Sequence, residues 1–101
     1  MPFYTFIMDY KGGTYISQID SSSLKTACVD WANSLRVSEI DEFGEISKNQ
    51  LIEQMKSEEP ILLKGLVNAW CSSPFLSKGT ALINIVQTEK LSDNDRPITD
   101  N

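Results

Sequence analysis

Residues 4–19 read YTFIMDYKGGTYISQI, and this stretch decides the fold. Aromatic and aliphatic side chains fill almost every position from 4 to 10, as in a strand buried on both faces. Lys11-Gly12-Gly13 is a turn signal, because glycine tolerates the positive φ angles of tight hairpins. Residues 14–19 are rich in β-branched and aromatic side chains. The stretch therefore predicts two antiparallel strands joined by a short turn.

The segment that follows this hairpin predicts the main helix. Asp20-Ser21-Ser22-Ser23 offers several N-cap residues. Apolar residues then recur at helical spacing and form one stripe: Leu24, Ala27, Cys28, Trp31, Ala32 and Leu35. We expect this helix to lie across the hairpin, with Trp31 filling the interface.

A second, narrower helix is expected after a loop at residues 38–45. Ser47 and Gln50 match a capping box, and Ile46 with Leu51 would form the hydrophobic staple in front of it. Pro60 prevents the helix from continuing. The pattern therefore predicts a helix that starts at Ser47.

The rest of the chain predicts short strands and a polar end. Residues 61–63 suit a short extended piece, and residues 66–72 and 80–88 suit two strands. We expect one domain over residues 1–90 and a flexible polar tail over residues 91–101.

The expected order of elements is β-β-α-α-β-β, so the predicted fold class is α+β: a mostly antiparallel four-stranded sheet with two helices on one face. The first and last strands are apolar on both sides, which favours neighbouring positions in the centre of the sheet. The face without helices needs a cover. A homodimer through that face is one alternative, and coverage by loops and the tail is the other.

Charge is concentrated in the middle of the chain. The 101 residues carry a net charge of −5, and residues 39–59, with seven acids and two lysines, carry the same net charge alone. With no stripe of Lys and Arg, nucleic-acid binding is not expected. No apolar run approaches the roughly 18 residues of a membrane span, and no signal peptide is recognisable. We therefore expect a cytoplasmic protein with no membrane partner.

Catalytic residue types are scarce. The chain has no histidine, which excludes Ser-His-Asp and Cys-His arrangements, and its two cysteines cannot form a usual structural zinc site. Cys28 on the helix stripe and Cys71 in a strand beside Trp70 suit core positions. We expect neither a cofactor nor a metal, and no enzymatic activity.

The acidic loop supplies the candidate partner-binding residues: Glu39, Asp41, Glu42, Phe43 and Glu45. Four carboxylates favour a basic protein partner. Phe43 could anchor such a partner, or it could fold back into the core. The leading hypothesis is a small non-enzymatic protein-binding module with an immunity or antitoxin-like role, since such proteins often mask basic partners.

Two further hypotheses stay open. One is a small-molecule-binding domain or minor enzyme with a pocket between sheet and helices, lined by Tyr15, Trp70 and Cys71. The other is a structural subunit of a homo-oligomer that uses both faces of its sheet.

A hairpin followed by a helix with Ala27 and Trp31 on its stripe resembles the first third of the small HicB-type antitoxins. Their Pro-Asp-Leu-Pro-Gly-Cys-like segment is absent here, because Asp20-Ser21-Ser22 follows Ile19. The chain is therefore not assigned to that family.

Overall fold

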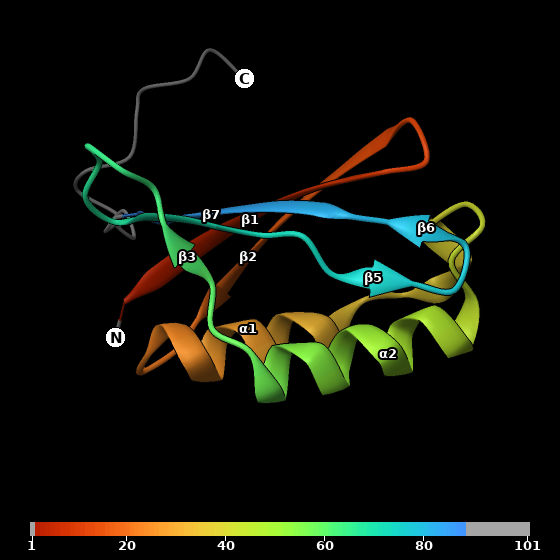
Figure 1. Ribbon diagram of the computed structural model, residues 1–101. Helices are drawn as coiled ribbons and strands as arrows, with labels where there is room; N and C mark the ends of the chain where they lie inside the picture. Colours follow the sequence, from red (N-terminus) through yellow and green to blue (C-terminus); the bar gives the residue numbers. More distant parts are fainter. Residues whose placement is uncertain (1, 89–101) are drawn as a thin grey trace, which may run out of the picture.

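Two helices cover one face of an antiparallel sheet in the computed structural model, which describes residues 2–88 (Figure 1). The main sheet has five strands in the order β2-β1-β7-β4-β3. The predicted α+β class is confirmed, but the predicted count of four strands is wrong. The additional strand is β3, Ile61–Leu62, which pairs with β4, Ala69–Ser72.

The first two strands form the predicted hairpin. β1 spans Phe3–Tyr10 and β2 spans Gly13–Asp20, with Met8 opposite Tyr15. Lys11 and Gly12 form the turn, with φ angles of 49° and 78°. Positive φ at both central residues matches the right-handed twist of the strands, which is why such turns close hairpins.

The centre of the sheet is formed by the two most apolar strands, as the sequence predicts. β7, Leu82–Thr88, lies between β1 and β4, and β1 lies between β7 and β2. The side chains of β1 and β7 that point to the helices are buried: Tyr4, Phe6, Met8, Tyr10, Ile83 and Ile85. Burial of this apolar surface is the main stabilising term of the fold.

The first helix, α1, spans Leu24–Ser34 and packs its apolar stripe on the hairpin. Trp31 is fully buried and stacks on Phe6, with 4.8 Å between the ring centroids. Its indole Nε1 donates a hydrogen bond to Ser17 Oγ at 3.0 Å. Ser23 is the N-cap, and its Oγ accepts from the backbone N–H of Thr26. The predicted interface through Trp31 is confirmed.

The second helix, α2, begins before the predicted residue. It spans Gly44–Ser57, with Phe43 at its N-cap, and a short 3-10 helix at Val37–Glu39 precedes it. The predicted capping box at Ser47 is wrong, because Ser47 is buried inside the helix with its Oγ 3.3 Å from Ser77 Oγ. The predicted staple is wrong as well, since Ile46 is 69% exposed.

A small hairpin beside α2 explains why Ser47 and Gln50 do not form a capping box. β5, Phe75–Leu76, pairs with β6, Gly79–Thr80, in a separate two-stranded sheet. Two glutamines of α2 bind its backbone: Gln50 Oε1 accepts from Ser77 N at 2.7 Å, and Gln54 bonds both the N–H and the C=O of Phe75. Gln50 and Gln54 therefore hold this hairpin beside α2, and Figure 1 shows β5 next to that helix.

The remaining strand boundaries are shorter than predicted. β4 covers Ala69–Ser72 within the predicted 66–72, and β7 covers Leu82–Thr88 within the predicted 80–88, whose first residue, Thr80, belongs to β6. The predicted tail over residues 91–101 lies outside the described residues.

Candidate functional site

The acidic loop runs from the end of the 3-10 helix into α2, and its four carboxylates lie at the surface. Glu39, Asp41, Glu42 and Glu45 are all exposed. Glu39 pairs with Arg36 at 3.5 Å. Within residues 2–88, the other three carboxylates make no ion pair. The loop therefore presents largely uncompensated negative charge.

Buried side chains hold this loop from inside. Ile40 and Phe43 belong to the core, and Phe43 packs edge-on against Tyr10 with 5.6 Å between the ring centroids. The Tyr10 hydroxyl donates to the Glu42 carbonyl at 2.7 Å. The backbone N–H of Asp41 donates to the Tyr15 hydroxyl at 3.4 Å. Two tyrosines of the hairpin thus fix the backbone between the carboxylates.

Glu42 occupies a conformation that glutamate rarely adopts. Its φ is +56°, in the left-handed region, and Gly44 follows with φ +76°. For a residue with a Cβ this costs on the order of 1 kcal/mol. Burial of Phe43 and the hydrogen bond from Tyr10 offset that cost. The reversal of the chain turns Glu42 outward while the ring of its neighbour Phe43 points inward.

Phe43 was expected either to anchor a partner or to fold back into the core. It lies in the core, since only 2% of the residue is exposed. Its ring is therefore no surface anchor, and the surface site consists of the four carboxylates. The apolar residue next to them is Ile46 in the first turn of α2, 69% exposed. Ile46 was missed because its spacing to Leu51 suited a staple.

Phe75 is a second residue with an exposed apolar side chain, and its backbone is held by Gln54. Phe75 is 79% exposed, while Gln54 holds both of its backbone polar groups. Residues 74–79 lie between the two strands expected at 66–72 and 80–88, and the sequence gave no sign of this contact. An aromatic side chain on a held backbone loses little entropy on binding, so Phe75 is a further candidate contact.

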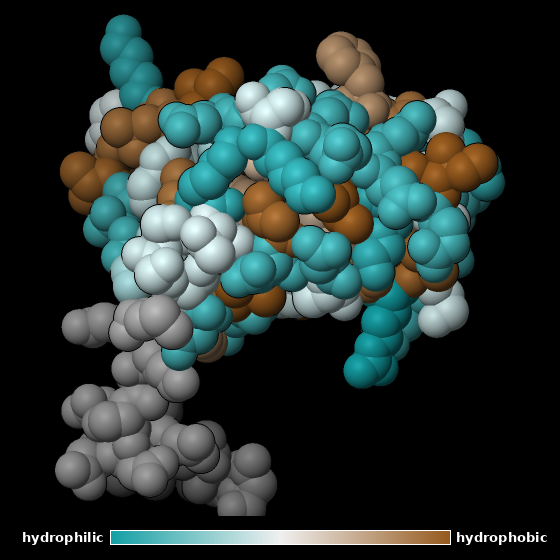
Figure 2. Space-filling view, turned by 90° about the horizontal axis from the view of Figure 1, so that it is seen from below, coloured by the Kyte–Doolittle hydropathy of each residue, from teal (hydrophilic) through white to brown (hydrophobic). Residues whose placement is uncertain are grey.

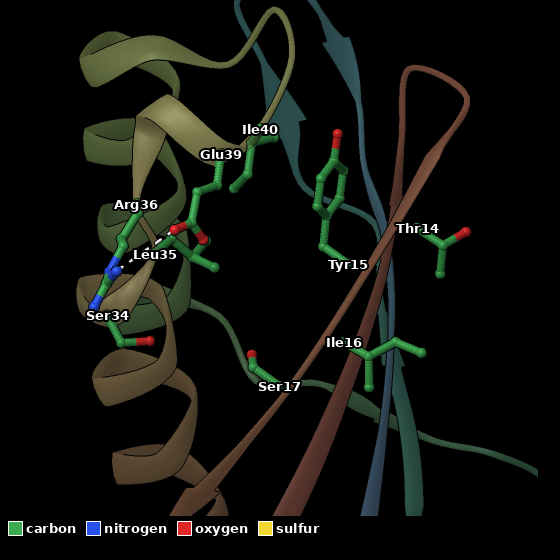
Figure 3. A pocket seen from close by; sticks show the side chains of 9 residues that line it. All are labelled: Thr14, Tyr15, Ile16, Ser17, Ser34, Leu35, Arg36, Glu39 and Ile40. Carbon is green, nitrogen blue, oxygen red and sulfur yellow. Dashed lines mark ion pairs between the residues drawn. The ribbon is translucent and has the colours of Figure 1, made fainter.

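A groove of about 350 Å³ lies between β2 and the segment from the end of α1 to the 3-10 helix (Figure 3). Tyr15 and Ser17 point to the side of the helices, whereas Thr14 and Ile16 point away from it. Arg36 and Glu39 form the opposite wall with their ion pair. The acidic loop and the groove share Glu39.

The three residues expected to line a single pocket are not brought together. Tyr15 lines this groove, Trp70 lines a hollow of about 160 Å³ with Lys25 and Pro60, and Cys71 lines a third hollow beside Glu58. Sequence reasoning placed them together because each lies in a strand. The strand order separates Tyr15 on the edge strand β2 from the other two on β4, and Trp70 and Cys71 are separated because successive side chains of a strand point to opposite faces of the sheet.

The two thiols differ in burial. Burial raises the pKa of the Cys28 thiol to about 11, whereas Cys71 is half-buried. In the native protein at pH 8, we expect the thiol reagent DTNB to modify Cys71 alone, and Cys28 only after unfolding. Cys71→Ser is the matched control and should show no fast reaction. Two fast-reacting thiols in the folded protein would contradict the burial of Cys28.

The helix-covered face is mainly hydrophilic, with hydrophobic residues in separate spots (Figure 2). Within residues 2–88, no cluster of three acidic or cysteine side chains is arranged to hold a metal ion. Among the helices described, none is long and apolar enough to cross a membrane. No protein-family model, curated protein or solved structure matches the chain.

Proposed function

We propose that this protein is a small non-enzymatic binding module that recognises a basic protein through its acidic loop. The observation that supports this most is the construction of the loop. Phe43 and two tyrosine hydroxyl groups fix its backbone, while Asp41, Glu42 and Glu45 stay exposed and unpaired. Because the backbone that carries the carboxylates is held before binding, a partner does not have to order the loop.

The chemistry of the surface suits a cationic partner with an apolar contact. Carboxylates of one sign attract a basic protein over roughly a Debye length and accelerate its association. Ile46 adds an exposed apolar side chain directly after Glu45. An immunity or antitoxin-like role, in which an acidic protein masks a basic partner, is part of this proposal.

The residue types available also favour binding over catalysis. The chain lacks histidine, and the raised pKa of Cys28 leaves that thiol protonated at neutral pH. The strained backbone at Glu42 lies within the acidic loop, and strain of this kind gathers at functional sites.

Neutralising the loop tests the proposal. The variant Glu39→Gln, Asp41→Asn, Glu42→Gln and Glu45→Gln removes its four charges and keeps the shapes of the side chains. We expect it to lose a partner that the wild-type chain captures stoichiometrically from native lysate, with association slowed roughly 100-fold at low salt. Raising the salt concentration should release the same partner from the wild type.

The matched control neutralises four exposed carboxylates elsewhere: Asp30→Asn, Glu53→Gln, Glu58→Gln and Glu59→Gln. Its net charge equals that of the loop variant, so loss of binding in both variants would reflect overall charge and not the loop. Full retention of the partner by the loop variant would sink the proposal.

A further inference from the structure

The outer edge of β2 is an open strand edge, because no other strand within residues 2–88 pairs with it. β2 ends the sheet, and the two-residue turn fixes which of its residues face β1. Tyr10 and Gly13 flank that turn as a hydrogen-bonded pair, so hydrogen bonding to β1 alternates from there. The backbone N–H and C=O groups of Thr14, Ile16 and Gln18 therefore point outward from the sheet.

Proteins usually guard such an edge with charges, proline, a bulge or a very short strand. The opposite edge of this sheet has such guards, because β3 is two residues long and follows Glu58, Glu59 and Pro60. β2 has eight residues, and its residues 13–19 include no charged side chain and no proline. Its register with β1 is continuous, without a bulge.

Charge makes this edge compatible with a second copy of the chain. The protein carries a net charge of −5, which opposes self-association over most of its surface. The groove along β2 has one cation and one anion among its lining residues, Arg36 and Glu39. A surface that carries one charge of each sign does not repel a second copy of itself.

The geometry points to a homodimer in which β2 pairs antiparallel with β2 of a second copy, so that the two sheets become one continuous sheet. The register that uses all three outward-facing residues places Ile16 opposite Ile16 of the second copy, and Thr14 opposite its Gln18. That pairing forms up to about six backbone hydrogen bonds. It also covers Ile16, which is 65% exposed in the single chain.

This arrangement leaves the acidic loop available. Asp41, Glu42 and Glu45 do not line the groove, so both copies would present these carboxylates. The dimer would be bivalent, which raises the avidity for a partner with repeated basic sites. The pairing itself does not depend on the proposed function, because it involves a strand edge and not Asp41, Glu42 or Glu45; the acidic loop and the groove share only Glu39.

Two measurements on the full chain test the pairing. Sedimentation velocity should show a dimer for the wild type, and a monomer for Ile16→Lys at the same concentration, because two lysines would then face each other at the axis. Since Ile16 is largely exposed, Ile16→Lys should retain the circular dichroism spectrum and melting temperature of the wild type.

Disulfide trapping tests the register. In a Cys71→Ser background, Ile16→Cys should form a covalent dimer on mild oxidation, because Cα atoms about 5.5 Å apart suit a disulfide. Leu82→Cys is the control: it lies on the open sheet face, and in this dimer the two copies of residue 82 are more than about 20 Å apart.

A wild type that stays monomeric up to submillimolar concentration would overturn the proposal. The outer edge of β2 would then be a candidate site for a strand of another protein. A dimer that persists in Ile16→Lys, or that is trapped through Leu82→Cys, would overturn it in favour of pairing through the sheet face.

Discussion

Replacing Trp31 by alanine is expected to destabilise the protein by about 3–5 kcal/mol, the largest effect of any single truncation in this fold. Trp31 is completely buried between α1 and the hairpin, stacked on Phe6. The substitution leaves a large cavity and also deprives Ser17 Oγ of its indole donor. Because small domains have only about 5–15 kcal/mol of stability, much of the variant should be unfolded at 37 °C.

Urea denaturation followed by circular dichroism measures this effect. Trp70→Ala is the matched control, since Trp70 is only half-buried and contacts Tyr4 at the larger centroid distance of 6.2 Å. We expect the control to lose less than half as much stability. Equal losses for the two tryptophans would show that the interface of α1 with the hairpin is not the centre of the core.

Replacing Phe43 by alanine is expected to destabilise the protein by about 3 kcal/mol and to weaken partner binding as well. Phe43 is the buried residue that holds the acidic loop against Tyr10. Without it, the left-handed backbone at Glu42 loses its support, and the three unpaired carboxylates become mobile. The loss of binding should appear mainly as faster dissociation, because the charges that steer association remain.

Tyr10→Phe separates the two contributions. It removes the hydroxyl that donates to the Glu42 carbonyl and keeps the ring that packs on Phe43, so a loss of about 1 kcal/mol is expected. Thermal melts and binding rates of the captured partner provide the comparison. Unchanged dissociation in folded Phe43→Ala would show that the order of the loop does not matter for recognition.

The burial of Cys28 has a consequence at alkaline pH. Because its pKa is raised to about 11 in the folded state, its protonated form contributes stability that is fully present below the pKa of an unfolded thiol. That contribution is lost as the pH rises towards 11, since the Cys28 thiol ionises at a lower pH in the unfolded chain than in the folded protein.

The parts of the fold that were predictable rest on local signals. The turn at Gly12 permits positive φ, and the apolar stripe through Trp31 has the period of a helix. The two most apolar strands were expected in the centre, where strands flank them on both sides. Exposure of the four carboxylates was equally predictable from the cost of burying a charge.

The start of α2 was not predictable in this way. Ser47 and Gln50 match a capping box, but both side chains contact the β5–β6 hairpin, about 30 residues further along the chain. A pattern read over four residues cannot distinguish a helix cap from a polar contact with a distant segment.

Local sequence patterns were enough to predict the α+β class, the hairpin, the helix α1 and the acidic character of the middle segment, since each depends on neighbouring residues. The fifth strand, the burial of Phe43 and the open edge of β2 became visible in the folded chain alone. A strand edge, a core position and a groove are relations between segments far apart in the chain. Their energies depend on the packing partner that each segment finds, which no local pattern specifies.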